Sequence, residues 1–310
     1  MKSDRILLAL CATIILTIGT IIYVIPQKEF SSSENRYLTK LQKPRIEAVL
    51  KGEYAKSISN FYSDQFPARE YATAIYSLTE KGLGKREIGG VILYGEQLIA
   101  RQSKESSYKV PIENAIIIES KFSLYEKSSK ELSLYYKTDH HRTTYGAYLL
   151  YLDACEILKI EPYPESYFKK QTVCTDFYGT AFFKSRLPKF AAEPDNIELW
   201  RYPSDEAVTL TADGKTLDLE SFYDYSRLST ADKYSIFLGG NYAFLSVRTS
   251  IEKPTLLLVK DSFANAVIPF LSLHFNIDLI DPRYATPSQT FSALSTPYSH
   301  KLFIGCLDSF

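Results

Sequence analysis

The stretch from residue 255 to residue 271 constrains the fold more than any other part of the sequence. It opens with the apolar, strand-like run Leu256–Val259, which stops abruptly at three polar residues, Lys260, Asp261 and Ser262. Apolar residues then recur at a helical spacing, at Phe263, Val267 and Phe270. The pattern predicts a buried strand that turns directly into a helix, with Ser262 at the junction.

A serine at such a junction has two interpretations. The N–H groups of a helix start stabilise negative charge that develops above a sheet edge, which suits a nucleophilic serine. Serine and aspartate are also favoured as helix N-caps, so Ser262 or Asp261 can have a purely structural role. The stretch by itself favours the cap, and the choice depends on residues elsewhere in the chain.

The order of the predicted elements indicates an α/β layered fold with a mainly parallel sheet. Helical spacing extends over 54–83, with an interruption at Pro67, and over 145–158, where Thr143 or Thr144 would cap the helix. Strand-like runs lie at 92–94, 97–99, 115–118, 132–136, 234–238, 256–259, 277–280 and 302–305. Between the two ends of the domain, Asp213-Gly214 within 208–219 predicts a β-hairpin insertion.

An uncharged run of about 20 residues, Ile6–Ile25, precedes this domain. At about 1.5 Å per residue the run is long enough to cross a bilayer. Lys2 and Arg5 favour a cytoplasmic N-terminus, and the bulky end of the run lacks a signal-peptidase pattern. The sequence therefore predicts a cytoplasmic tail (1–5), an uncleaved transmembrane anchor in the lipid bilayer (6–25), a linker or stalk (26–55) and an extracytoplasmic domain (56–310).

Composition argues against two kinds of ligand, a nucleic acid and a cysteine-bound zinc ion. Lys and Arg together number 36, as do Asp and Glu, so the net charge is zero and no basic surplus indicates a nucleic-acid partner. The four cysteines, at 11, 155, 174 and 306, show no CxxC spacing, so a zinc site built on cysteine is not expected. A disulfide between Cys155 and Cys174 is left open.

Three residues that follow predicted strands form a chemically sensible set: Asp139, Asn241 and Ser262. Serine needs a base to take its proton, histidine suits that role, and a carboxylate orients the histidine. Asp139 and His141 are two residues apart and face the same way in an extended segment. Gly240 and Asn241 offer hydrogen-bond donors to an oxyanion.

Each member also has a plainer interpretation. His140 and His141 can be surface residues, or can belong to a metal site that begins at Asp139, since imidazole and carboxylate are good ligands. The remaining histidines, His274 and His300, lack carboxylates at ligand spacing. We therefore expect no metal and no cofactor.

The segment 135–148, YYKTDHHRTTYGAY, resembles the signature of the DHHW protein family. Further blocks in family order are 33–36, 64–69, 177–180, 239–242, 260–265 and 281–284, so the resemblance covers most of the chain after the apolar run. That family resembles the SGNH-like catalytic domains of alginate O-acetyltransferase proteins. The resemblance implies an SGNH-hydrolase-like fold with Ser262 as nucleophile, His141 as base and Asp139 as its orienting acid, and more weakly an oxyanion role for Asn241.

The resemblance implies a membrane-anchored, extracytoplasmic serine O-acyltransferase or esterase of the bacterial cell envelope, acting on acetyl groups of cell-surface polysaccharide. A multi-spanning membrane acyltransferase is the implied acyl-donating partner. Arg142 stands where the family has Trp, in a position to contact substrate, and the segment 101–132 is shorter than usual. These departures favour the alternative, a catalytically degenerate envelope protein that binds glycan or a protein partner. Neither the acyl donor and acceptor nor the choice between transfer and hydrolysis follows from the sequence.

Overall fold

The computed structural model describes residues 26–31, 36–66, 69–85, 87–88, 91–94, 97–100, 134–203, 205 and 208–305, with scattered positions between 10 and 24. The chain divides into two compact units, Met1–Gly89 with Phe183–Ala191, and Gly90–Phe182 with Ala192–Phe310. The predicted strand at 115–118 and much of the predicted anchor, 6–25, lie outside the described residues. Among the residues that are described, no helix has the length and apolar character needed to cross a membrane.

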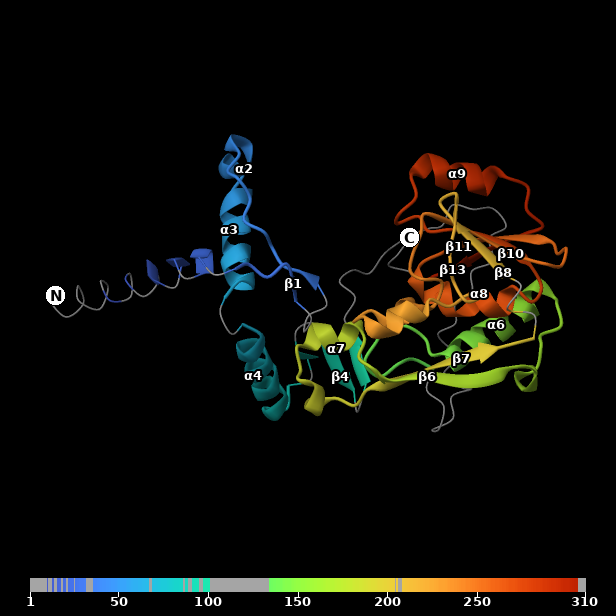
Figure 1. The fold of residues 1–310 in the computed structure, drawn as a ribbon, viewed down its shortest axis with the longest axis horizontal. Coiled ribbons are helices and arrows are strands. Elements are labelled where there is room, and N and C mark those ends of the chain that lie inside the picture. The colour runs from blue at the N-terminus through green and yellow to red at the C-terminus, as the bar shows by residue number, and fades with distance from the viewer. Residues whose placement is uncertain are drawn as a thin grey trace. The chain divides into compact units, whose positions relative to one another are not determined.

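The N-terminal unit consists mainly of helices: α2 (Ile46–Leu50), α3 (Glu53–Asp64) and α4 (Arg69–Gly82) (Figure 1). The short strands β1 (Phe30–Ser31) and β2 (Arg36–Tyr37) pair antiparallel, and β3 (Glu87–Ile88) follows α4. Asp64 accepts hydrogen bonds from the N–H and the hydroxyl of Thr39, at 2.9 and 2.8 Å, which ties the preceding segment to the end of α3. The predicted interruption of the helical region around Pro67 is confirmed, although residue 67 itself is not described.

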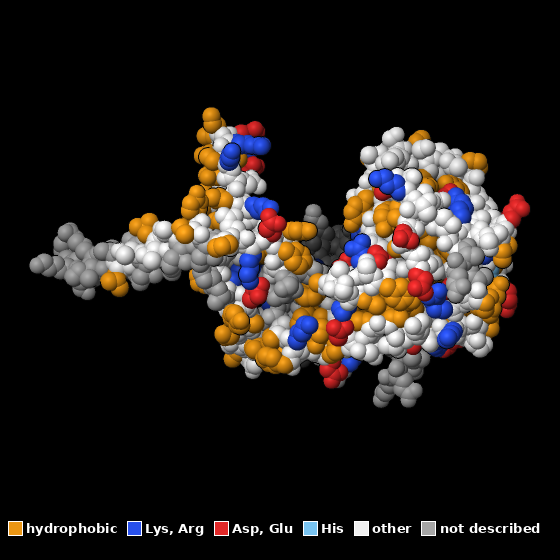
Figure 2. Space-filling model, viewed as in Figure 1, with side chains coloured by type: hydrophobic (Ala, Val, Ile, Leu, Met, Phe, Trp, Pro, Cys, Tyr) orange, Lys and Arg blue, Asp and Glu red, His pale blue; other side chains and the backbone are white. Residues whose placement is uncertain are grey.

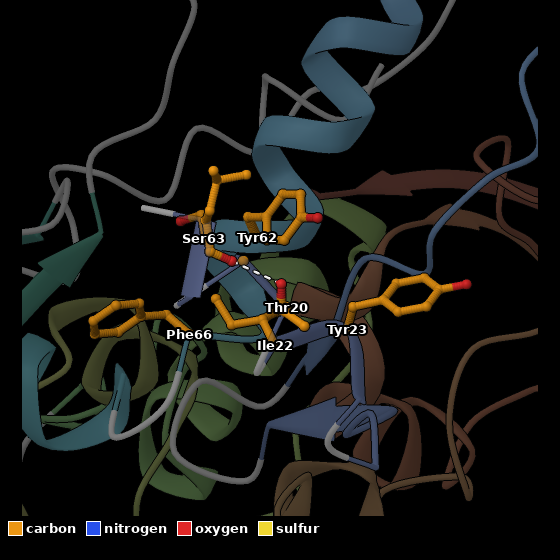
Figure 3. Close-up of a pocket in the computed structure, with 8 residues that line it drawn as sticks. Thr20, Ile22, Tyr23, Tyr62, Ser63 and Phe66 are labelled. Atoms are coloured by element: carbon orange, nitrogen blue, oxygen red, sulfur yellow. Dashed lines mark hydrogen bonds between the residues drawn. The ribbon is translucent and has the colours of Figure 1, made fainter. Parts of the chain in front are cut away.

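An apolar pocket of about 680 Å³ lies within this unit, between helical residues around position 20 and α3 (Figure 3). Its lining consists of Leu16, Gly19, Thr20, Ile22, Tyr23, Tyr62, Ser63 and Phe66. The Thr20 hydroxyl donates a 2.8 Å hydrogen bond to the carbonyl of Leu16, so it is satisfied within its own helical turn. None of the site residues predicted from the sequence lines this pocket.

The second unit is built around a six-stranded sheet with the order β13-β11-β12-β10-β8-β9. Its strands are β8 (Val208–Ala212), β9 (Lys215–Thr216), β10 (Phe244–Thr249), β11 (Thr255–Lys260), β12 (Asn276–Ile280) and β13 (His300–Ile304). β11 is parallel to β12 and β13, but β10 is antiparallel to β12 and β8. The sheet is therefore mixed and not mainly parallel. Its antiparallel pairings outside the predicted hairpin pass through β10, a strand that was not predicted from the sequence, and apolar spacing does not reveal strand direction in any case.

The predicted hairpin is present between β8 and β9, and the fold around it is mixed α/β. Asp213 and Gly214 both have positive φ, 46° and 82°, as a two-residue hairpin turn requires. The hairpin forms one edge of the central sheet instead of an insertion outside it. Near the start of this unit, β4 (Val91–Tyr94) and β5 (Gln97–Ala100) pair antiparallel, as the sequence predicts.

Helices cover both faces of β11, which explains its uninterrupted apolar sequence. Leu256 and Leu258 pack in the main core with α6 (Thr144–Leu158) and α8 (Ile268–Leu271). Leu257 and Val259 point to the other face, where they pack with Ala293 of α9 (Pro287–Ser295). Figure 1 shows α9 on one side of the sheet and α8 and α6 on the other.

The predicted helix over 145–158 is confirmed as α6, and Thr143 caps it by accepting a 3.1 Å hydrogen bond from the Gly146 N–H. Next along the chain, β6 (Lys169–Phe177) pairs antiparallel with β7 (Asp195–Arg201), and α7 (Thr180–Ser185) lies between them in sequence. Trp200 of β7 packs against Tyr148 of α6 with ring centroids 5.0 Å apart. This contact joins the two-stranded pair to the main core.

Two predicted strands are wrong. Of 132–136, the described residues contribute an isolated bridge between Tyr135 and Arg142. The run 234–238 forms a 3₁₀ helix at Lys233–Ile236 and a bridge at Phe237, because burial of successive residues on irregular backbone produces the same apolar run as a strand. The disulfide left open by the sequence is also absent, since Cys155 and Cys174 are both buried free thiols.

Gly146→Ala should lower the free energy of unfolding by about 2 kcal/mol or more, since overpacking against backbone cannot relax easily. A Cβ at this position would lie 2.2 Å from the Leu134 carbonyl oxygen. Urea unfolding, followed by the fluorescence of Trp200, the single tryptophan, measures the loss in this unit. Glu156→Ala, at an exposed position of α6, is the control and should change the value by less than about 0.5 kcal/mol. Equal unfolding midpoints for the glycine variant and wild type would contradict the prediction.

Candidate active site

Ser262 lies at the carboxyl end of β11, immediately after the polar pair Lys260 and Asp261. Asp261 is the N-cap of the following 3₁₀ helix (Ser262–Val267), and its carboxylate accepts a 2.8 Å hydrogen bond from the Phe263 N–H. The capping role that the sequence left open between two residues therefore belongs to Asp261. The Ser262 side chain remains available for another role.

His141 forms hydrogen bonds through both ring nitrogens. Its Nε2 lies 2.9 Å from the Ser262 Oγ, and its Nδ1 lies 2.5 Å from Asp139 Oδ1. A carboxylate only accepts hydrogen bonds, so Nδ1 carries the proton and Nε2 is left to accept from the serine hydroxyl. The structure thus brings Asp139, His141 and Ser262 together in one continuous series.

Asp139 is held from several sides. Its Oδ2 accepts from the Thr180 N–H at 2.6 Å, and its Oδ1 also accepts from the backbone N–H of His141 at 2.9 Å. Burial by itself would raise the pKa of this carboxyl. The adjacent imidazole and the hydrogen bonds from His141 and Thr180 outweigh burial and hold the pKa of Asp139 well below its ordinary value. The carboxylate is therefore ionised over the whole working range of a protein.

Asp195 anchors the segment that carries Asp139 and His141. Its carboxylate accepts hydrogen bonds from the backbone N–H groups of Lys137 and Thr138, at 2.7 and 2.8 Å, and from the Thr138 hydroxyl at 2.6 Å. The same hydroxyl oxygen accepts from the Gly179 N–H at 3.1 Å. These bonds replace the strand ladder that the sequence predicted before Asp139.

Aromatic rings surround the imidazole of His141. The Tyr234 ring lies parallel to it, with centroids 3.7 Å apart and 5° between the planes, and its hydroxyl donates to the Ser262 carbonyl at 3.3 Å. Phe263 and His140 contact the imidazole with centroid distances of 5.3 and 3.9 Å. Burial, with the negative charge of Asp139, raises the pKa of Tyr234 far above its usual value, so this phenol stays neutral.

Sequence reasoning missed Thr180, Asp195 and Tyr234, although the block 177–180 was part of the family resemblance. That block supplied a signal for Gly179 and Thr180 without indicating which atom they would contact. Asp195 and Tyr234 lie in segments with no distinctive motif, so their contacts become visible only in three dimensions.

The residues predicted to contact the oxyanion or the substrate, Gly240, Asn241 and Arg142, lie in different environments. Asn241 lies by the end of β11, where its Oδ1 accepts from Lys260 Nζ at 3.3 Å and from Asn265 Nδ2 at 3.2 Å. Gly240 precedes it with φ of 138°. The Arg142 guanidinium lies over the ring of Tyr135, 5.4 Å from its centroid. Substrate contacts by these three residues remain predictions.

The side chains of Asp139, His140 and His141 hold their ligand atoms within 4.8 Å of one another, a spacing that a metal ion could bridge. However, Asp139 Oδ1 and His141 Nδ1 are hydrogen-bonded to each other, and the other nitrogen of His141 faces Ser262. Coordination would require these bonds to break. The arrangement therefore fits an Asp-His-Ser series better than a metal site.

Gly179→Ala should remove the hydrogen bond between Asp139 and His141. A Cβ at this position would lie 2.2 Å from the Asp139 Cβ and 2.3 Å from its Oδ2, so the carboxylate must move. The wild type should show a far-downfield imidazole N–H proton resonance, which this variant should lack. Gly214→Ala, in the β8–β9 turn, meets no atom within 4 Å and should keep the resonance, at a cost of about 1 kcal/mol for its positive φ. An unchanged resonance in Gly179→Ala would count against the described geometry.

Comparison with known proteins identifies the family. Residues 119–280, just over half of the chain, match the model of the DHHW protein family. A DHHW family protein from Eubacterium siraeum DSM 15702 is 25% identical, with 58% of this chain and 62% of that chain covered and a TM-score of 0.49. Two structures of Bacillus cereus PatB1, one of them with a sulfonyl adduct, are 18% and 19% identical. They cover 60% and 59% of this chain and 65% and 66% of the other, with TM-scores of 0.45 and 0.46.

The chain thus spans less than two thirds of the length of each of these solved proteins. No curated protein matches it. The match to the family model covers the segment with Asp139 and His141 as well as the strand that leads to Ser262. The chain belongs to the DHHW protein family.

Proposed function

We propose that this chain is a serine-dependent O-acyltransferase or esterase with an SGNH-hydrolase-like fold. In this proposal Ser262 is the nucleophile, His141 the general base and Asp139 the residue that orients the base. The observation that carries the proposal is the continuous hydrogen-bonded series from the Asp139 carboxylate through the imidazole to the Ser262 hydroxyl. Serine becomes nucleophilic near neutral pH only with such a base in contact.

The first half-reaction transfers the acyl group to the enzyme. Ser262 Oγ attacks the acyl carbonyl carbon as its proton moves to His141 Nε2, which gives a tetrahedral oxyanion and an imidazolium. The ionised Asp139 stabilises this imidazolium through the bond to Nδ1. The imidazolium then gives its proton to the departing oxygen, the carbonyl re-forms, and the acyl group remains as an ester on Ser262.

The second half-reaction removes the acyl group by the same steps in reverse. A hydroxyl of the acceptor, or water, loses its proton to His141 Nε2 and attacks the ester carbonyl, and Ser262 leaves with that proton. Transfer and hydrolysis differ only in how well water is excluded from the acyl-enzyme. The family resemblance supports acetyl as the acyl group, a cell-surface polysaccharide as acceptor and a multi-spanning membrane acyltransferase as the source of acetyl.

We further propose that residues 6–25 anchor the chain in the cytoplasmic membrane, with the catalytic unit outside it. The proposal is supported by the uncharged run itself, and by Lys2 and Arg5 ahead of it. Such an anchor would keep the enzyme close to a membrane-bound acyl donor and to polysaccharide as it leaves the cell.

The non-catalytic alternative rests on the replacement of the family Trp by Arg142 and on the short segment 101–132, which lies outside the described residues. The side chain of Arg142 lies over Tyr135, and its backbone pairs with the same residue. The bonds of His141 to Asp139 and Ser262 are intact beside this replacement. The geometry therefore supports the enzyme more strongly than a binding protein.

The full-length chain, purified in detergent, should release acetate from a chromogenic acetyl ester and form a covalent adduct on Ser262 with phenylmethylsulfonyl fluoride. Ser262→Ala and His141→Ala should each lower kcat about 10³-fold or more, because neither residue works without the other. Rates and the mass of the labelled peptide measure both effects. Ser229→Ala, in an exposed 3₁₀ segment, is the matched serine control and should keep full activity.

A wild-type protein that folds but neither turns over the ester nor reacts with the sulfonyl fluoride would overturn the enzyme proposal and favour the binding alternative. Arg142→Trp would then show whether that single replacement silences the site, because it restores the family residue.

The anchor has its own test. The full chain should sediment with membranes and resist extraction by alkaline carbonate, and external protease should digest its C-terminal unit in intact spheroplasts. A variant that lacks residues 1–25 should appear in the soluble fraction. Recovery of the full chain in the soluble fraction would rule out the proposed anchor.

A further inference from the structure

Lys260 is the last residue of β11, two positions before Ser262, and it is almost completely buried, with 1% of its surface exposed. A buried ammonium group is costly unless its protons are all directed at acceptors. In the described part of the chain its hydrogen-bond partners are two side-chain amides: Asn265 Oδ1 at 2.6 Å and Asn241 Oδ1 at 3.3 Å. Burying this charge is costly, and Lys260 is only two positions from Ser262. The combination indicates that Lys260 has a function at the serine site.

The chemistry of the ammonium fixes the orientation of both amides. Lysine in its charged form only donates hydrogen bonds, so each asparagine must turn its oxygen, and not its nitrogen, towards Nζ. The NH₂ group of Asn265 donates to Asn241 Oδ1 at 3.2 Å. The positions of oxygen and nitrogen in both amides therefore agree with all three hydrogen bonds among Lys260, Asn241 and Asn265. As a consequence, the Asn241 oxygen has two donors and its NH₂ group faces away from Lys260.

The NH₂ group of Asn241 has no hydrogen-bond acceptor among the described residues, and Asn241 lies by the end of the strand that leads to Ser262. A neutral amide donor with a fixed direction, backed by a buried positive charge, is what a developing oxyanion requires. We propose that Lys260 is a positioning residue of the serine site, which holds the Asn241 amide so that its NH₂ donates to the oxyanion. The inference rests on the proposed serine chemistry.

Among the described residues, three charged groups influence Lys260: Asp281 and Asp261 favour its charged form, and Arg283 disfavours it. Arg283 is largely neutralised by its two hydrogen bonds to the Asp281 carboxylate, at 2.9 and 2.6 Å. Burial has the largest effect, and it lowers the pKa of Lys260 to about 8. Above this pKa the neutral amine carries a lone pair and accepts hydrogen bonds as well, so the Asn241 amide is no longer held in one orientation.

The full chain serves for the test, with a chromogenic acetyl ester as the probe. Lys260→Met should lower kcat about 10- to 100-fold with little change in KM, because the group acts on the transition state. Wild-type activity should fall as pH rises through about 8, where Lys260 loses its proton. This fall in activity at alkaline pH, the alkaline limb of the profile, should be absent from Lys260→Met. Lys260→Gln, which keeps a donor without the charge, should recover part of kcat but not the limb.

Lys253→Met is the matched control. Lys253 precedes β11 at its other end, is also partly buried, and donates a 2.7 Å hydrogen bond to the Ser272 carbonyl. Burial lowers its pKa as well. Loss of this lysine should leave kcat and the pH profile unchanged. Thermal unfolding of each variant shows whether any loss reflects an unfolded protein, and Lys260→Gln carries the test if Lys260→Met does not fold.

A double-mutant cycle separates positioning from general stability. If Lys260 acts through Asn241, then Lys260→Met should cause almost no further loss of kcat in an Asn241→Ala background. If the losses of kcat in the two single variants multiply in the double variant, the residues act independently and the inference is overturned. A folded Lys260→Met protein with wild-type kcat and pH profile would also overturn it. In either case Ser262→Ala would still abolish activity, so the serine mechanism would stand. A wild-type chain without activity or sulfonylation would remove both proposals together.

Discussion

The hydrogen bond between His141 Nε2 and Ser262 Oγ joins segments that are 121 residues apart in the sequence, and the rest of the site depends on it. The serine end is fixed by a strand buried on both faces. The histidine end lies on irregular backbone, which has no sheet ladder to define its position. The Asp195 carboxylate supplies that definition by accepting from the Thr138 N–H, and the Thr180 N–H does so by donating to the Asp139 carboxylate.

Buried polar groups gather at the carboxyl ends of β11 and β12, and the structure satisfies them in separate small networks. Lys260 is bonded to two asparagines, while Asp281 is bonded to Arg283. Asp261 caps the helix that follows. In a low-dielectric interior such bonds are strong and a missing partner is costly, so these networks rigidify the end of the sheet. Rigid donors with fixed directions are what the proposed serine chemistry at this sheet edge requires.

Local patterns predicted the elements whose burial follows a simple period. The apolar run of β11, the spacing of α6 with its Thr143 cap, and the Asp213-Gly214 turn were all readable because each depends on neighbouring residues. The structure of the run 234–238 could not be predicted in this way, since Tyr234 is buried against His141 and not in a strand ladder. The strand β10 was not predicted at all, and its antiparallel direction is defined only by its pairing with β8 and β12.

The sequence by itself determined the residue types at the site and the family to which the chain belongs. Asp139 and His141 are two residues apart, and Ser262 follows a strand, so a serine–histidine chemistry could be proposed without coordinates. Only the tertiary structure decided that Asp261 and not Ser262 is the cap, that Tyr234 stacks on His141, and that Lys260 faces Asn241. The contacts of Tyr234 with His141 and of Lys260 with Asn241 join residues distant in sequence, and the cap depends on the local direction of the backbone. Their energies depend on burial and direction, which a linear pattern does not contain.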